Sequence, residues 1–92
     1  MKLKLLLQST NAYYEAKGIT ETKNGARFNA LDKVANYIRS LYGESDPDID
    51  ELMKVDKTFV GNSYEKKKGK SLNDAEKQVF TDIYKVYCQI KD

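Results

Sequence analysis

Apolar residues recur at three- and four-residue steps in four segments of this 92-residue chain, and none of the segments shows the period-two alternation of a half-buried strand. Such spacing gives each segment one apolar stripe along a helix. A helix cannot bury its own stripe, so the four helices are expected to pack together. Because the connections between them are short, neighbours should run antiparallel. The sequence therefore predicts an all-α fold, an antiparallel up-down four-helix bundle, that forms one domain from residue 1 to residue 92.

Glycines mark the expected ends of the first two helices. The first helix is predicted from about Lys2 to Lys17, directly before Gly18, and the second from about Ala26 to Tyr42, directly before Gly43. Glycine readily adopts the left-handed conformation that terminates many helices. Both predicted helices therefore have a residue that suits their C-terminal end.

The last two helices have predicted starts that depend on capping residues. The third should open at Ser45-Asp46-Pro47, where Ser45 or Asp46 can cap free amides and proline is tolerated in the first turn. Gly61-Asn62-Ser63 should end or kink it. The fourth, from about Leu72 to Ile90, should be capped by Ser71 or Asn73, with an acid three residues on. The third helix's apolar face is predicted to hold Ile49, Leu52, Met53, Phe59, Val60 and Tyr64. The seam of the fourth is predicted to hold Leu72, Ala75, Val79, Ile83, Val86 and Ile90.

The chain contains no histidine and a single cysteine, Cys88. Histidine is the usual general base near neutral pH and the commonest metal ligand, and a thiol needs an activating neighbour to be reactive. We therefore expect no enzyme activity and interpret Cys88 as a small apolar filler. A lone cysteine cannot form an internal disulfide, and the apolar run that follows Lys4 stops at Gln8 after three residues, too short for a signal peptide. A cytoplasmic location is the expectation.

Two ligand-binding motifs occur only in part. Asp46-Pro47-Asp48-Ile49-Asp50 has the spacing of the first three ligands of a calcium loop, but Glu51 and Lys57 replace the required glycine and the bidentate acid. Gly69-Lys70-Ser71 matches the end of a phosphate-binding loop, but Tyr64 stands where that loop needs its first glycine. We therefore expect no metal and no cofactor. Helix caps and solvent-exposed faces account for the other acids considered, Asp74, Glu76 and Asp82.

Basic and aromatic residues of the C-terminal half are the candidates for partner binding. The lysine cluster is either a solvated loop or a site for phosphates or anionic lipid headgroups at a membrane surface. Nucleic-acid binding is disfavoured, because basic and aromatic residues do not interleave on one helix. The tyrosines of the last helix, near Lys85, are either half-buried bundle residues or interface anchors. The candidate residues are Lys66, Lys67, Lys68, Lys70, Tyr84, Tyr87 and Lys91.

One family has a similar layout. The residues that carry the similarity are Asn36-Tyr37-Ile38, Leu41, Pro47, Ser71-Leu72-Asn73-Asp74 and Ile83. Over about residues 28–90, their order resembles the class IIa (pediocin-like) bacteriocin immunity proteins. The resemblance implies a cytoplasmic antiparallel four-helix bundle without a catalytic site. It also implies a partner, the mannose phosphotransferase permease occupied by the bacteriocin, which the protein recognises from inside to stop the pore from leaking. In that family the C-terminal half governs specificity, which points here to the region from Lys66 to Lys91.

A second hypothesis comes from another class of protein. A small phage or mobile-element protein could inhibit a host nucleic-acid enzyme, with the acidic segment as a phosphate mimic or the lysines as a docking patch. The size and composition fit both hypotheses. The acids, however, are confined to the start of one predicted helix, whereas a phosphate mimic spreads them over an exposed face.

Overall fold

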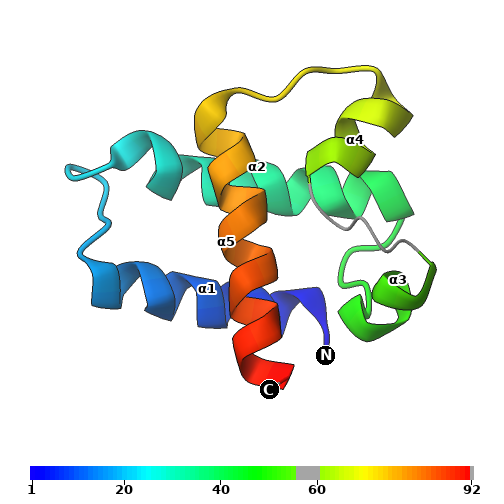
Figure 1. Cartoon of the computed structure of the whole chain (residues 1–92), viewed down its shortest axis with the longest axis horizontal. Helices are drawn as coiled ribbons and strands as arrows, with labels where there is room; N and C mark the ends of the chain where they lie inside the picture. Colours follow the sequence, from blue (N-terminus) through cyan, green and yellow to red (C-terminus); the bar gives the residue numbers. More distant parts are fainter. Residues whose placement is uncertain (56–60, 92) are drawn as a thin grey trace.

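The computed structural model describes residues 1–55 and 61–91, and the fold of these residues is all-α. The helices are α1 (Leu3–Lys17), α2 (Gly25–Tyr42), α3 (Ile49–Val55), α4 (Gly61–Lys68) and α5 (Asp74–Lys91). In Figure 1, α1 and α2 run antiparallel in one layer, and α5 crosses in front of both at a steep angle. The α5 helix packs against α1, α2 and α4, while α3 and α4 lie at one end of the α1–α2 layer.

The prediction of an all-α fold is confirmed, but the antiparallel four-helix bundle is not. The stretch predicted as one third helix contains both α3 and α4, and α5 crosses its neighbours rather than running antiparallel to them. Gly61-Asn62-Ser63, expected to end or kink a helix, instead begins α4. Such residues cost little at a helix start, where the first amides have no helical acceptor in any case. Phe59 and Val60, predicted on an apolar face, lie outside the described residues.

The helices α1 and α2 end where the sequence predicts. Gly18 and Gly43 both adopt the left-handed conformation, with φ of 74° and 69°. After α1, the Gly18 amide donates to the Glu15 carbonyl and the Ile19 amide donates to the Tyr14 carbonyl. These bonds satisfy carbonyls that the end of a helix leaves without partners.

The helix α3 begins at Ile49, later than the predicted start at Pro47. The backbone before α3 pairs instead with the N-terminal residues of the chain. The Leu3 amide donates to the Pro47 carbonyl at 2.9 Å, and the Ile49 amide donates to the Met1 carbonyl at 2.7 Å. Because this pairing uses an extended backbone, the chain cannot enter the helix until Ile49.

The cap of α3 therefore differs from the one predicted. Neither Ser45 nor Asp46 caps this helix. The Asp48 Oδ1 accepts from the Asp50 amide at 3.0 Å and from the Glu51 amide at 3.4 Å. Aspartate is a favoured N-terminal cap, so the shift moves the cap to the next suitable side chain along the chain.

The core is formed by the apolar faces of α1, α2 and α5, which Ile49 and Tyr64 complete from α3 and α4. Glu76, Phe80 and Asp82 of α5 are buried although they lie outside the predicted seam of the last helix. Of the seam residues, Leu72, Val79, Ile83 and Val86 are buried, Ala75 is half-buried and one is exposed. Ile90 is 47% exposed, because the last turn of α5 projects beyond α1 (Figure 1). The fully buried apolar side chains include Leu3, Leu6, Tyr14, Val34, Ile49, Val79 and Ile83.

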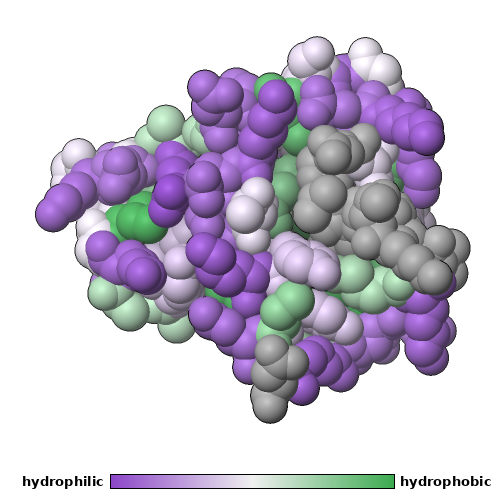
Figure 2. All heavy atoms as spheres, in the orientation of Figure 1, coloured by the Kyte–Doolittle hydropathy of each residue, from purple (hydrophilic) through white to green (hydrophobic). Residues whose placement is uncertain are grey.

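Polar side chains cover most of the face on which α5 lies. Figure 2 shows hydrophilic residues over the upper part of that face and along its edge near α4, with smaller apolar areas between them. Within the described residues, the helices are too short or too polar to cross a bilayer.

Candidate functional site

The predicted lysine cluster lies at the end of α4. Lys66–Lys68 form the last turn of this helix, so the interpretation of the cluster as a loop is wrong for these three residues. Lys70 follows Gly69, which ends the helix with a φ of 66°. The Lys67 ammonium lies 5.4 Å from the centroid of the Tyr42 ring. All four lysines are exposed to solvent. Cations in a last turn interact favourably with the negative end of the helix dipole.

Tyr84 is the most exposed of the candidate aromatic residues. Its side chain is 40% exposed, on the side of α5 that faces away from the core. A hydrogen bond with the Cys88 side chain raises the pKa of Tyr84 above its usual range. Cys88 is itself half-buried and unpaired by a disulfide, at the edge of the core rather than inside it. Tyr84 thus has the position of a surface residue and not of a core residue.

Glu76 forms the predicted capping box at the start of α5. The Asn73 Oδ1 accepts from the Glu76 amide at 2.8 Å, and the Glu76 Oε1 accepts from the Asn73 amide at 3.0 Å. The other Glu76 oxygen accepts from the Tyr37 hydroxyl. This bond and partial burial raise the pKa of Tyr37 to about 12. The sequence predicts this cap but not its burial, with Glu76 only 6% exposed.

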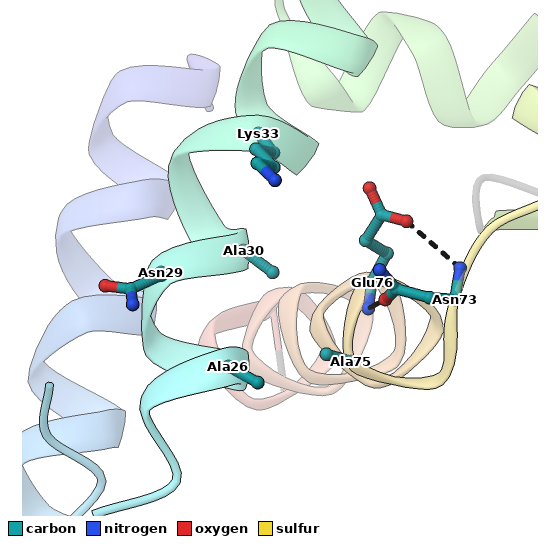
Figure 3. Close-up of a pocket in the computed structure, with 7 residues that line it drawn as sticks. All are labelled: Ala26, Asn29, Ala30, Lys33, Asn73, Ala75 and Glu76. Carbon is teal, nitrogen blue, oxygen red and sulfur yellow. Dashed lines mark hydrogen bonds between the residues drawn. The ribbon is translucent and has the colours of Figure 1, made fainter. Parts of the chain in front are cut away.

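A cavity of about 190 Å³ opens beside the capping box, between α2 and the start of α5 (Figure 3). Small residues of α2 line it, together with Lys33, Asn73 and Glu76. Both carboxylate oxygens of Glu76 already accept hydrogen bonds from the chain. The cavity therefore contains no buried polar group that needs a ligand.

Asp82, which the sequence assigned to a cap or a solvent-exposed face, is buried at 1% exposure. Its Oδ2 accepts from the Tyr14 hydroxyl at 2.9 Å, and its Oδ1 accepts from the Gln78 side-chain amide at 3.0 Å. The Arg27 Nε lies 3.6 Å from Oδ2. Burial, followed by the bond to Asp82, raises the pKa of Tyr14. This network links α1, α2 and α5, which is a structural role.

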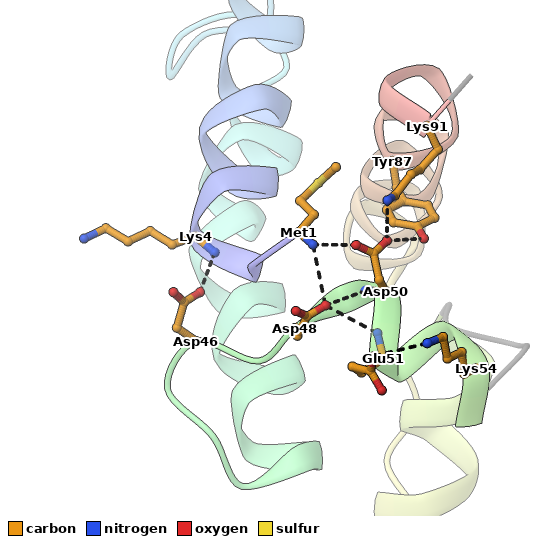
Figure 4. Close-up of polar contacts among 9 residues, drawn as sticks. All are labelled: Met1, Lys4, Asp46, Asp48, Asp50, Glu51, Lys54, Tyr87 and Lys91. Carbon is orange, nitrogen blue, oxygen red and sulfur yellow. Dashed lines mark hydrogen bonds and ion pairs between the residues drawn. The ribbon is translucent and has the colours of Figure 1, made fainter.

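Two of the predicted partner-binding residues, Tyr87 and Lys91, converge on Asp50 (Figure 4). The Tyr87 hydroxyl donates to Asp50 Oδ1 at 2.7 Å, and the Lys91 ammonium lies 3.0 Å from the same oxygen. The Met1 ammonium donates to the other oxygen, Oδ2. The Asp50 carboxylate therefore joins the N-terminal residue, the start of α3 and the end of α5.

The electrostatics of this cluster follow from its geometry. The Met1 ammonium, then Tyr87 and Lys91, hold the pKa of Asp50 well below its usual range. The bond to Asp50 raises the pKa of Tyr87 to about 12 and raises the pKa of the Met1 ammonium. Tyr87 and Lys91 thus contact a residue that is distant in the sequence, whereas the side chains of Tyr84, Lys66 and Lys68 are exposed to solvent.

The remaining acids near α3 also have partners within the chain. The Asp46 Oδ1 accepts from the Lys4 amide at 2.8 Å, in the first turn of α1. Asp48 caps α3 and lies 3.5 Å from the Met1 ammonium. These carboxylates point toward different partners (Figure 4). Across residues 1–55 and 61–91, His, Cys, Asp and Glu do not gather in any group of three that could hold a metal ion.

The sequence prediction missed one lysine that lies near Tyr84 on the outward side of α5. Lys77 precedes Tyr84 by two turns and is exposed, as is Lys85 directly after Tyr84. The sequence contains the signal that could have identified Lys77, because both lysines lie opposite the apolar seam that contains Ile83.

Comparisons of the chain with protein-family models, with curated proteins and with solved structures find no match.

Proposed function

We propose that this chain is a bacteriocin immunity protein of the pediocin-like class. It acts from the cytoplasm to block the pore that the bacteriocin forms at its membrane receptor, a permease of the mannose phosphotransferase type. The observation that carries the proposal is the exposure of Tyr84 and of the α4 lysines, all in the half of the chain to which the family resemblance assigns recognition. Tyrosine is a common anchor of protein interfaces.

The polar interior of the protein supports a binding role rather than catalysis. Asp50, Glu76 and Asp82 all accept hydrogen bonds from donors of the same chain. A general acid or base must reach the proton of a substrate, and these carboxylates are occupied in holding helices together. We therefore assign the proposed binding function to exposed residues of the protein surface.

In this proposal, the five helices of the chain correspond to the four helices of the resembled family with one helix divided in two. The helices α3 and α4 together take the place of the third helix, and α5 corresponds to the fourth. The steep crossing of α5 over α1 and α2 is a difference from an up-down bundle. The recognition half would then be α4, α5 and the segment between them.

The inhibitor hypothesis receives less support in its acidic form. A phosphate mimic needs exposed carboxylates on one face, but Asp46, Asp48 and Asp50 accept hydrogen bonds from α1, α3 and α5, respectively. The lysine form of the hypothesis predicts binding to a host protein or to nucleic acid. A pull-down from host lysate tests it.

The test of the proposal is expression in a bacteriocin-sensitive strain that is challenged with a panel of pediocin-like peptides. We expect increased tolerance to at least one peptide. Tyr84→Ala should abolish protection with nearly unchanged melting temperature, because the side chain is exposed. Tyr87→Ala should lower the melting temperature, because it removes a donor to Asp50. A folded, expressed protein that gives no protection against any peptide would rule out immunity.

A further inference from the structure

The outward side of α5 and the end of α4 both carry exposed lysines, and the outward side of α5 also carries the exposed ring of Tyr84. We define the α4–α5 lysine surface by Lys66, Lys68, Lys70, Lys77, Tyr84 and Lys85. In Figure 1, α5 lies in front of α1 and α2, so the side of α5 opposite its core residues faces solvent. Hydrophilic residues cover much of this face in Figure 2. The surface thus combines residues from two helices and the segment between them.

The acids of residues 63–91 do not balance the charge of this surface. Residues 63–91 contain seven lysines and four acids. Glu76 and Asp82 are buried, and Glu65 is partly buried and accepts from the Leu72 amide. Asp74 is therefore the one fully exposed acid in this stretch. Among the described residues, the cations of the ion pairs are the Met1 ammonium, Arg27, Lys54 and Lys91, none of which belongs to this surface.

We infer that the α4–α5 lysine surface docks the chain onto a lipid bilayer that contains anionic headgroups. Lysine ammonium groups are attracted to the negative potential of such a bilayer. Tyr84 adds an amphipathic ring of the kind that settles at the level of the headgroups. The surface provides the charge and the aromatic contact that peripheral binding requires.

Features of the same surface favour a bilayer over nucleic acid. Arginine suits bidentate recognition of phosphates and bases, but Arg27 pairs with Asp82, and Arg39 donates to the Ser45 carbonyl and to Asn36. A single-stranded nucleic acid would also require several stacking rings, and this surface has only Tyr84. We therefore expect this surface to recognise the negative charge density of a bilayer rather than a particular arrangement of phosphates or bases.

This inference rests on the proposed function and deepens it, because binding to the bilayer would hold the chain beside a membrane receptor. Vesicle binding can nevertheless be measured independently of bacteriocin immunity, so the two proposals can fail separately. The probes are vesicles of phosphatidylcholine alone and of phosphatidylcholine mixed with phosphatidylglycerol, tested by co-sedimentation. We expect binding to the mixed vesicles only. Binding should weaken as salt is added, because the screening length is about 8 Å at physiological ionic strength.

A pair of matched variants tests which lysines are responsible. Changing Lys66, Lys68, Lys77 and Lys85 to Gln should lower the partition coefficient on mixed vesicles by about tenfold or more. The control changes four exposed lysines of α1 and its neighbouring loop, Lys2, Lys4, Lys17 and Lys23, to Gln. The control has the same net charge change and should retain binding. An equal loss in both variants would overturn the assignment to this surface.

A fluorescent reporter tests the orientation of the bound protein. The chain contains no tryptophan, so Tyr84→Trp introduces a single indole. Its emission should shift to the blue on mixed vesicles, whereas that of Leu5→Trp, at a 55% exposed position of α1, should not. A shift at Leu5→Trp alone would overturn the inference. So would an absence of vesicle binding accompanied by lysine-dependent binding to labelled RNA or DNA, which would assign the surface to nucleic acid.

Discussion

Removal of the Tyr14 hydroxyl should destabilise the protein by about 1.5 to 3 kcal/mol, the usual contribution of a hydrogen bond to a charged group. The Tyr14 hydroxyl donates to Asp82 Oδ2 at 2.9 Å, and both residues are almost completely buried. Tyr14→Phe keeps the ring and its packing but leaves Oδ2 without its nearest donor. Arg27 Nε, at 3.6 Å, is too far to form a good hydrogen bond in its place. The expected cost is therefore that of a buried oxygen that has lost its partner.

Urea denaturation monitored by circular dichroism measures this cost. A small domain has a urea m-value of about 1 kcal/mol per molar, so the midpoint should fall by roughly 1.5 to 3 M. Tyr13→Phe is the matched control, since Tyr13 is the preceding residue and its hydroxyl has no hydrogen-bond partner among the described residues. Its effect should stay within about 0.5 kcal/mol.

A double-mutant cycle with Asp82→Asn separates the hydrogen bond from other effects of the two substitutions. The coupling energy between Tyr14→Phe and Asp82→Asn should be about 0.5 to 3 kcal/mol, because the two side chains are in contact. An unchanged midpoint for Tyr14→Phe, or additive effects in the cycle, would refute the stabilising role of this bond.

Three further predictions follow from burial and charge. Ile83→Ala should cost about 2 to 5 kcal/mol in urea denaturation, while Ile90→Ala, at a 47% exposed position, should cost less than about 0.5 kcal/mol. Because the pKa of Asp50 is lowered, the ionised carboxylate stabilises the fold above the ordinary pKa of 3.8, and this stabilisation is lost as the pH falls below 3.8. In Asp50→Asn, the melting temperature should therefore depend less on pH in this acidic range. The pKa values of Tyr37 and Tyr87 are raised to about 12 each, so their protonated hydroxyls stabilise the fold below pH 10, and this stabilisation is lost as the pH rises toward 12. Tyrosinate absorbance and alkaline unfolding should therefore increase over the same pH range.

The sequence predicts what depends on neighbouring residues. The all-α class follows from apolar spacing, and the ends of α1 and α2 follow from Gly18 and Gly43. The cap of α5 follows from Asn73 and Glu76, which are three residues apart. Each of these signals acts over about one helical turn, so the local sequence contains all the information that it needs.

The exposed part of the candidate site is also partly readable from sequence. Tyr84 is predicted as an interface candidate, and its exposure agrees with a surface role. The neighbouring lysines of α5 lie opposite the apolar seam, where the helical period already places them outside the core. The lysines of α4 were recognised as a cluster, but their position in a helix was not.

The tertiary structure decides the rest, because it brings together residues that are far apart in the chain. The sequence leaves open whether Tyr87 is a half-buried bundle residue or an interface anchor, and it does not predict that Tyr87 and Lys91 contact Asp50, 37 residues before Tyr87. The sequence assigns Asp82 to a helix cap or a solvent-exposed face, but Asp82 is buried and accepts from Tyr14, 68 residues away. The Asp82 carboxylate is buried with one local donor, Gln78, but Tyr14 and Arg27 reach it from other helices, and the local sequence does not show that they come together. The crossing of α5 over α1 and α2 brings these residues into contact, and it also determines which lysines and which tyrosine of α5 remain exposed.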